Sequence, residues 1–416
     1  MIKNVYTYSF KVILSFFFIT LLFIISCSDD STNNNDGNII KIGALMPLTG
    51  SGSSAGESML AAINLAVDDI KSQGNNYQIE LINENTDTNP ETALEKLKHL
   101  KSLGLTFVIG PYSSAELNYI KEYADSNNIF LISPSSVAIS LAIENDNIFR
   151  LATNDYHQVA AFSKYFDFTE IESLCAAYRN DTWGNSLFFA MLEKSEGHKY
   201  QFFNEIKYHT STTDYSEFAK LINDKITEEI DNNITANKIG IFLACFNEGT
   251  DILEKASYLN KTDSVKWYGT SAFALNSTLI KISVASEFAI ATDFICPVYA
   301  PDDNFKSAWI PVSAKLKSIL GRESESYALT AYDAVKIAFG ASILLKTDNS
   351  IKEPRKALIQ FAENNSGITG NFSLDKYGDR KTGNYYFWKV RKSGDIYEWY
   401  SKYIYNTEKD ELKQLD

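Results

Sequence analysis

From Ile39 onward, short apolar runs alternate with longer amphipathic segments. The runs at 39–48, 77–86 and 105–111 have the length of strands and are rich in Ile, Leu and Val, whereas 54–74 and 89–104 repeat apolar residues at helical spacing. Strands that alternate with helices in this way form a parallel sheet with helices on both faces, so the sequence predicts an α/β fold. A helix, a strand and a further strand continue the alternation at 114–127, 129–133 and 147–153.

A second series of the same kind begins near residue 155. Its helices and strands are expected at 155–165, 173–179, 184–197, 202–208, 214–230, 238–246, 248–260 and 265–269. Two consecutive α/β series of similar size indicate two lobes rather than one wide sheet. The rest of the chain predicts a strand, three helices and a closing hairpin at 288–299, 304–320, 326–346, 355–363 and 370–399. In that hairpin, Tyr377, Gly378 and Asp379 supply turn residues.

The first 27 residues differ from the rest of the chain. Lys3 and Lys11 precede an apolar run of fifteen residues that ends at Cys27, and this length fits a signal-peptide core better than a membrane span. Ser26 before Cys27 resembles the lipobox of bacterial lipoproteins, which implies a signal peptide at 1–27 and a lipid on Cys27. The alternatives are a secretory signal that leaves Cys27 as a free thiol, and an uncleaved anchor.

Residues 28–38 are polar and contain too few apolar groups to pack, so we expect a flexible tether between the lipid and the fold. Asp29 and Asp30 resemble the tag that some Gram-negative lineages use to place lipoproteins on the outer surface. We therefore expect an exported chain that its lipid anchors to the cell envelope, on the periplasmic face or on the outer surface.

Composition and motifs limit the chemistry. The formal net charge of −13 disfavours nucleic acids as partners. The histidines belong to no recognisable triad or metal cluster, Walker, GxSxG and HExxH motifs are absent, and the glycines after residue 49 have the wrong spacing for a dinucleotide loop. We expect no catalysis, no metal and no cofactor. Cys175, Cys245 and Cys296 lie in or beside apolar runs, so buried free thiols are expected, with one disulfide left open.

The order of several motifs resembles one family. KIGALMPLTGSGSSAGES is followed by VIGPYSSAE, FLISPSS, FRLATNDYHQ, AAYRNDTWGNSL, LTAYDAV and GNFSLDKYGD. The series is similar to type I periplasmic binding proteins, and nearest to the branched-chain amino-acid binding proteins of ABC importers. The resemblance implies a two-lobed Venus-flytrap fold whose chain crosses between the lobes three times. Lobe one would comprise 39–154 and 294–365, lobe two 155–293 and 366–403, and a C-terminal tail 404–416.

Serines follow two strands of the expected first lobe. Ser113 and Ser114 stand between a strand and a helix, where unpaired N–H groups and the helix dipole suit a carboxylate. The resemblance implies that Ser114 holds the carboxylate of a ligand, whereas helix capping is the alternative role for these serines. Ser135 and Ser136 follow the next strand, and Val137 replaces a hydroxyl that commonly accepts from the ligand ammonium in amino-acid binders. This departure weakens an amino-acid assignment.

The expected second lobe offers an acid and an aromatic ring. Glu248 aligns with an acid that pairs with the ligand ammonium in amino-acid binders, although a carboxylate at a helix start also complements the helix dipole. Trp183 takes the place of an aromatic residue that closes over the ligand, and Tyr178 belongs to the same strand-to-helix turn. Core packing is the alternative for these rings.

Three further residues are weaker candidates for ligand contact. Ser54 lies in the first loop, beside Ala55, where some relatives carry a bulky aromatic residue. Asp155 lies at the expected hinge and Tyr327 in the third region.

These features predict a solute-binding protein that captures an amino acid, an amide or a short peptide by hinge closure. An ABC permease would be its partner, or an outer-membrane partner if the chain lies on the outer surface. The alternative is an interaction protein, because some outer-membrane lipoproteins use the same fold to regulate cell-wall enzymes without a small ligand. Polar Ser114 and Glu248 on facing loops favour ligand binding, whereas a cleft filled by its own side chains would favour the interaction protein.

Overall fold

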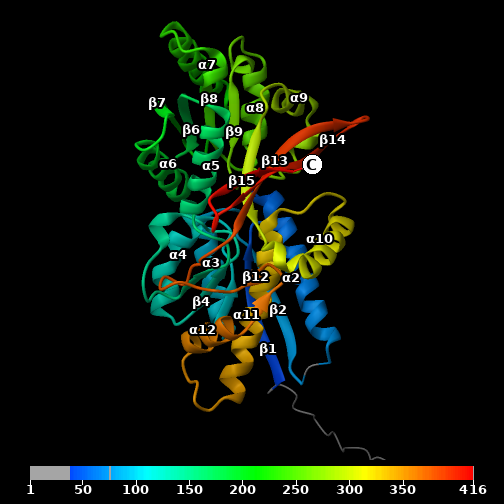
Figure 1. Ribbon diagram of the computed structural model, residues 1–416. Coiled ribbons are helices and arrows are strands. Elements are labelled where there is room, and N and C mark those ends of the chain that lie inside the picture. Colours follow the sequence, from blue (N-terminus) through cyan, green and yellow to red (C-terminus); the bar gives the residue numbers. More distant parts are fainter. Residues whose placement is uncertain (1–37, 75, 416) are drawn as a thin grey trace, which may run out of the picture. The chain divides into compact units, whose positions relative to one another are not determined.

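The computed structural model describes residues 38–74 and 76–415 (Figure 1). The expected signal peptide, the lipidated Cys27 and the tether up to residue 37 lie outside the described residues. The described residues from Ile40 onward group into one compact unit, which contains two β-sheets and the helices that flank them. The predicted α/β class, with two lobes that each contain a sheet, is confirmed.

The first sheet has five strands in the order β2-β1-β3-β4-β5. They are β1 (Ile39–Met46), β2 (Gln78–Asn85), β3 (Phe107–Ile109), β4 (Phe130–Ser133) and β5 (Ile148–Arg150). The connections carry α2 (Ser53–Ser72), α3 (Pro90–Ser102) and α4 (Ser114–Ser126). Successive residues of β1 point to opposite faces of the sheet, so Leu45 joins the core under α3 and α4 while Ala44 and Met46 join the core under α2.

The second sheet has eight strands in the order β15-β14-β13-β10-β9-β8-β6-β7. Its parallel part comprises β6 (Ser173–Arg179), β7 (Gln201–Tyr208), β8 (Ile239–Ala244), β9 (Lys266–Gly269) and β10 (Ile295–Ala300). Every residue of β6 and β8 is buried, because helices cover both faces of a parallel sheet. These helices are α5 (Asp155–Thr169), α6 (Thr182–Ser195), α7 (Ser216–Asp231), α8 (Gly249–Ser257) and α9 (Ser283–Ala291).

The strand β10 does not lie where the sequence placed it. Residues from 294 were assigned to lobe one, but β10 pairs with β9 in parallel and with β13 in antiparallel orientation, and so belongs to the second sheet. The single strand predicted at 288–299 is the end of α9 followed by β10. A short apolar run has the same composition in a buried helix and in a buried strand, and periodicity does not separate them.

The segment after residue 366 also differs from its assignment to lobe two. The short strands β11 (Ser366–Gly367) and β12 (Gly370–Asn371) pair with each other, and the turn after them bonds to β5 of the first sheet. There the Arg150 amide donates to the Gly378 carbonyl at 3.0 Å, and the buried Arg150 guanidinium pairs with Asp379. Residues 377–379 thus tie this segment to the first lobe rather than closing the predicted hairpin.

The hairpin itself is formed by β13 (Asn384–Ser393) and β14 (Ile396–Asn406), and Gly394 at φ +62° lies in its turn. The expected tail from residue 404 continues β14 and then forms β15 (Glu411–Gln414), an edge strand of the second sheet. Sequence patterns reveal a strand but not the sheet that it joins, because the joining is decided by contacts distant along the chain.

Three helices follow β10 in the chain, α10 (Lys306–Leu320), α11 (Ser326–Thr347) and α12 (Pro354–Asn364). Helix α11 packs against α2 and α12. Residues Tyr327–Thr347 are long and apolar enough to cross a membrane, but 72% of the most apolar window is buried inside the protein, as in a core helix. Cys175, Cys245 and Cys296 are buried free thiols.

Candidate functional site

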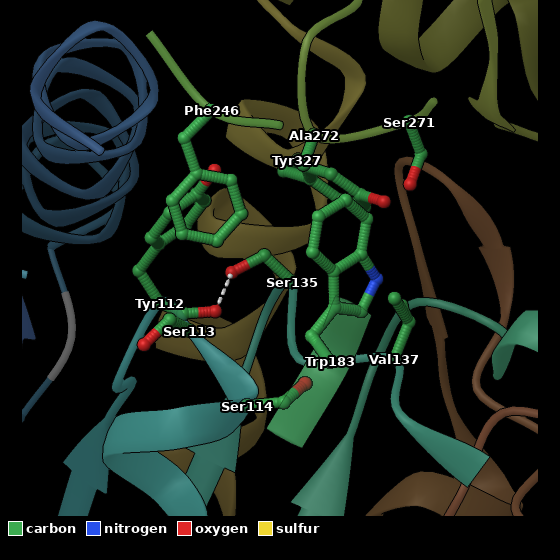
Figure 2. A pocket seen from close by; sticks show the side chains of 10 residues that line it. All are labelled: Tyr112, Ser113, Ser114, Ser135, Val137, Trp183, Phe246, Ser271, Ala272 and Tyr327. Carbon is green, nitrogen blue, oxygen red and sulfur yellow. Dashed lines mark hydrogen bonds between the residues drawn. The ribbon is translucent and has the colours of Figure 1, made fainter. Parts of the chain in front are cut away.

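A small cavity lies where strands of both sheets end (Figure 2). Its volume of about 20 Å³ is enough for roughly one water molecule. Its lining contains hydroxyls, aromatic rings and small apolar groups but no charged side chain: Tyr112, Ser113, Ser114, Ser135, Val137, Trp183, Phe246, Ser271, Ala272 and Tyr327. Of the predicted ligand contacts, Ser113, Ser114, Ser135, Trp183 and Tyr327 are therefore brought together here.

The serines of the first lobe already have partners within the protein. Ser113 is the N-cap of α4 and forms a capping box, in which its Oγ accepts from the Glu116 amide at 3.2 Å while Glu116 accepts from the Ser113 amide at 2.9 Å. The Ser114 Oγ lies 2.9 Å from the Ser136 Oγ, which places Ser136 next to the cavity but not in its lining. Ser135 donates to the Tyr112 carbonyl at 2.9 Å. The capping interpretation of Ser113 is confirmed, and its contact with a ligand stays a prediction.

Aromatic rings from both lobes occupy most of the cleft. Trp183, the second residue of α6, stacks on Phe246 with 5.3 Å between ring centroids and 27° between ring planes. Tyr112, which follows β3, is tilted against the same ring at 5.3 Å. Figure 2 shows the three rings side by side. Tyr112 and Phe246 were missed in the sequence, although each closely follows the end of a strand, where parallel sheets place their ligands.

A buried ion network lies next to Phe246. The Arg179 guanidinium is 3.8 Å from the Phe246 ring centroid and pairs with the carboxylates of Asp181 and Glu248. Glu248 Oε1 also accepts from the Tyr208 hydroxyl at 2.7 Å and from the Phe246 amide at 3.1 Å. Burial lowers and the two carboxylates raise the pKa of Arg179, with a net rise, so its charge is permanent.

Glu248 consequently occupies a different place from the one expected of a ligand contact. It is bound to Arg179 and does not line the cavity, although its Oε2 is buried and has no hydrogen-bond partner. The sequence placed Glu248 at the start of a helix but gave no sign of its ion pair, since Arg179 is 69 residues away along the chain.

A second polar network connects the start of α5 with the loop after β9. Gln158 donates to Asp155 Oδ1 at 2.7 Å and accepts from the Ser271 amide at 2.7 Å. Asp155 Oδ2 and Ser271 Oγ are both buried and have no partner. Burial raises the pKa of Asp155 to about 8, against the opposing hydrogen bond from Gln158, so Asp155 is largely neutral at pH 7. Asp155 is close to the Trp183 side chain but outside the cavity lining.

The two remaining candidates lie elsewhere. Tyr178 stacks on Phe188 with 4.8 Å between ring centroids and donates to Glu205 at 3.1 Å, so it is not part of the cavity lining. Ser54 lines a separate groove of about 540 Å³ beside α2, and its hydroxyl lies 3.0 Å from the Ser277 hydroxyl and 3.2 Å from the Glu325 carboxyl.

Direct hydrogen bonds between the two lobes hold the cleft closed. The Asn247 amide donates to the Ser51 carbonyl at 3.1 Å, and its side-chain nitrogen donates to the Ser53 hydroxyl at 3.1 Å. On another side of the cleft the Ile139 amide donates to the Ser186 hydroxyl at 3.1 Å. A ligand larger than water therefore enters only if these contacts open or if the aromatic rings move.

The described part of the chain, 38–74 and 76–415, contains no group of three or more His, Cys, Asp or Glu placed to hold a metal ion. The cavity offers hydrogen-bond donors and acceptors and aromatic surface, which are means of binding a small molecule.

The chain is similar to known proteins over most of its length. Residues 58–393 match the receptor family ligand binding region (ANF_receptor). An uncharacterised protein of Methanocaldococcus jannaschii, MJ1266, is 25% identical over 378 residues, which cover 86% of this chain and 88% of that protein.

Solved structures with the same fold include LivJ of Streptococcus pneumoniae, a branched-chain amino-acid transporter substrate-binding protein in complex with isoleucine. It is 18% identical, with a TM-score of 0.67 over 87% of this chain and 99% of LivJ. A solute-binding protein of an ABC transporter from Rhodopseudomonas palustris, in complex with 3,4-dihydroxybenzoic acid, is 17% identical, with a TM-score of 0.69 over 89% of this chain and 98% of that structure. The chain therefore belongs to the receptor ligand-binding-region family and has the type I periplasmic-binding-protein fold.

Proposed function

We propose that this chain is an exported solute-binding protein that captures a small polar ligand in the cavity at the start of α4. The observation that carries the proposal is the buried Ser271 hydroxyl, which lines the cavity beside Tyr327 and has no partner with full hydrogen-bond geometry among the described residues. A buried polar group without a partner costs free energy, so such groups are rare in folded proteins. A ligand that bonds to Ser271 removes this cost only when the cleft is closed around it.

The first lobe would receive the ligand. Of the first N–H groups of α4, that of Glu116 donates to the Ser113 hydroxyl, whereas those of Ser114 and Ala115 have no partner inside the helix, and the Ser114 hydroxyl lies beside them. A carboxylate or an amide oxygen suits this place, which agrees with amino acids, amides and short peptides as candidate ligands. The relatives solved with isoleucine and with 3,4-dihydroxybenzoic acid both hold small carboxylates.

Closure of the second lobe would then cover the ligand with Trp183 and Phe246. A ligand shifts the protein toward the closed form only if it contacts that form better than the open form. Since the closed cavity has a volume of about 20 Å³, larger ligands would displace one of the two rings. Release of the ring stack is thus part of the proposed binding step.

The N-terminal sequence predicts the cellular location in which this function would take place. A lipid on Cys27 would hold the chain at the cell envelope, and an ABC permease would receive the ligand. If Asp29 and Asp30 direct the chain to the outer surface, an outer-membrane partner would take the place of the permease. Mass spectrometry of Cys27 in the mature protein tests the anchor.

One observation favours a second candidate function. The cleft is filled by its own rings and is closed by hydrogen bonds between the lobes. An interaction protein that works without a small ligand would have such a cleft. In that case no ligand stabilises the chain, and Trp183 and Phe246 serve only to hold the lobes together.

A thermal-shift screen of the chain from Asn38 onward separates the two functions. The panel contains amino acids, amides, short peptides, simple carboxylates and sugars. A ligand at a hundred times its dissociation constant adds about 2.7 kcal/mol of stability. We expect a clear rise for one class, weakened in Ser114→Ala and kept in Ser126→Ala, which changes an exposed serine at the far end of α4. No rise with any compound would contradict solute binding and favour the interaction protein.

A further inference from the structure

The charge around the cavity narrows the class of ligand. No side chain that lines the cavity carries a formal charge. A ligand with a carboxylate and an ammonium group would bring one negative and one positive charge into this closed space. Each charge that leaves water needs a compensating partner, so the partners on the two lobes decide which charge is accepted.

No acidic side chain lines the cavity, so an ammonium group inside it would meet no carboxylate directly. The Glu248 carboxylate lies outside the lining and shares the buried Arg179 cation with Asp181. Its Oε1 accepts from Arg179, while its Oε2 has no hydrogen-bond partner among the described residues. Burial, against hydrogen bonds from Ser113, raises the pKa of Glu116, and the Glu116 carboxyl is engaged in the α4 capping box. Asp155 and Glu325 are buried, and burial raises the pKa of each to about 8. At pH 7 these two carboxyls are mostly protonated and therefore largely neutral.

A carboxylate finds a different environment. The start of α4, with the Ser114 N–H group that the capping box leaves unused and the positive end of the helix dipole, lies at the cavity. Independently of the helix, Ser271 is 4% exposed and lines the cavity beside Tyr327. Its hydroxyl has no partner with full hydrogen-bond geometry among the described residues, so the O–H can donate to an acceptor oxygen. Tyr112, Trp183, Phe246 and Tyr327 provide aromatic walls for an apolar body.

We propose that the cavity selects carboxylates that lack an ammonium group, namely monocarboxylate anions with an apolar or aromatic body, over the corresponding α-amino acids. This inference rests on the proposed function, because it assumes that the cavity binds a small ligand. The Arg179–Glu248 ion pair acts as the determinant of specificity, since it holds through Oε1, outside the cavity lining, the acid that would otherwise attract an ammonium group.

Matched pairs of compounds test the inference on the unaltered protein. Each pair differs only in the ammonium group: L-leucine and 4-methylpentanoate, L-phenylalanine and 3-phenylpropanoate, L-alanine and propanoate. Isothermal titration calorimetry at pH 7 is expected to show at least about tenfold tighter binding of the carboxylate in every pair that binds. The neutral amide 4-methylpentanamide is expected to bind more weakly than 4-methylpentanoate.

The outcomes distinguish the inference from the function on which it rests. Tighter binding of the amino acids, or equal binding of the amide, would overturn the inference and leave solute binding intact. Binding of a sugar alone would do the same. No binding of any compound in the pairs or in the wider panel would overturn both.

A variant then tests the role of the ion pair. Arg179→Met leaves Glu248 without its cation, and we expect the preference to shift about tenfold or more toward the amino acid of each pair. The double variant Arg179→Met with Glu248→Gln removes both charges and should keep the original preference. An unchanged preference in Arg179→Met would overturn the role of the pair. If that variant does not fold, the matched pairs on the unaltered protein still decide the inference.

Discussion

The two faces of the cavity differ in how their polar and charged groups are paired. The face from the first lobe carries hydroxyls beside the rings of Tyr112 and Tyr327, and its serines hydrogen-bond to one another, to backbone or to the Glu116 carboxyl. The face from the second lobe presents two rings and the Ser271 hydroxyl to the cavity, while its charges are paired with one another outside the lining. The first face is thus prepared to receive a polar group, and the second to exclude water from it.

The largest expected effect on stability comes from removing the cation of the buried ion network in the second lobe. Arg179→Ala leaves the carboxylates of Asp181 and Glu248 buried without their cation, since their side chains are only 8% and 9% exposed. We expect a loss of about 3–5 kcal/mol in the free energy of unfolding, measured by chemical denaturation. The control is Lys207→Ala, which removes the partner of the exposed carboxylate of Glu205, and it should cost far less. Equal losses in both variants would contradict a structural role of the network.

A second prediction concerns the pH dependence of stability. The pKa of Asp155 rises to about 8 because it is buried, so the folded state holds a proton that the unfolded state loses near pH 4. The stability that the protonated Asp155 contributes to the folded state is therefore fully present below about pH 4 and is lost as the pH rises toward 8. In this window, Asp155→Asn should remove up to about 1.4 kcal/mol per pH unit from the slope of stability against pH.

The control for Asp155 is Asp68→Asn, which changes an exposed acid on α2 and should leave the slope unchanged. Glu325, whose pKa burial also raises to about 8, should maintain part of the slope in the Asp155 variant. A slope equal to that of the unaltered protein would show that Asp155 is charged in the folded state.

The sequence predicted the first face better than the second for a physical reason. Ser113, Ser114 and Ser135 follow strand ends within short segments, so local patterns alone bring them to one edge of the first sheet. The part of Glu248 in the site depends on Arg179, which meets it only after β6 and β8 have paired. Residues whose surroundings are assembled by tertiary contacts are not visible in a local pattern.

The dependence on tertiary contacts also explains where the observed fold differs from the predicted one. The alternation of apolar runs and helices predicted nearly every element of both sheets, because each element carries its own periodicity. The assignment of 294–300 and of 366–380 to lobes required knowledge of which strand or turn lies beside them. Trp183 and Tyr327 were placed at the cleft by resemblance and do line the cavity, and their contact with a ligand stays a prediction.

The packing of the aromatic rings at the cavity can be weakened without removing a charge. Phe246→Leu replaces the ring that contacts Trp183, Tyr112 and Arg179 with a smaller side chain. We expect the free energy of unfolding to fall by about 1–2 kcal/mol. The cavity should grow at the same time, so that the affinity for the larger compounds of a ligand series rises relative to the smaller ones. Calorimetry across a series of carboxylates of increasing length measures this shift. Phe288→Leu, in the core beside Trp267, is the control and should lower stability without changing the size preference.

The smallest expected effect is the difference in stability between variants of two neighbouring serines. Ser113→Ala removes the N-cap of α4 and leaves Glu116 without its hydroxyl donor, so stability should fall by about 1 kcal/mol. Ser114→Ala removes only the hydroxyl contact with Ser136 and the acceptor for the Ala138 amide, and should cost less. For binding the order should reverse, because Ser114 is the predicted contact of the carboxylate while Ser113 is bound to Glu116. Chemical denaturation and calorimetry on both variants check the two orders, and a larger loss of affinity in Ser113→Ala would assign the ligand contact to the capping residue.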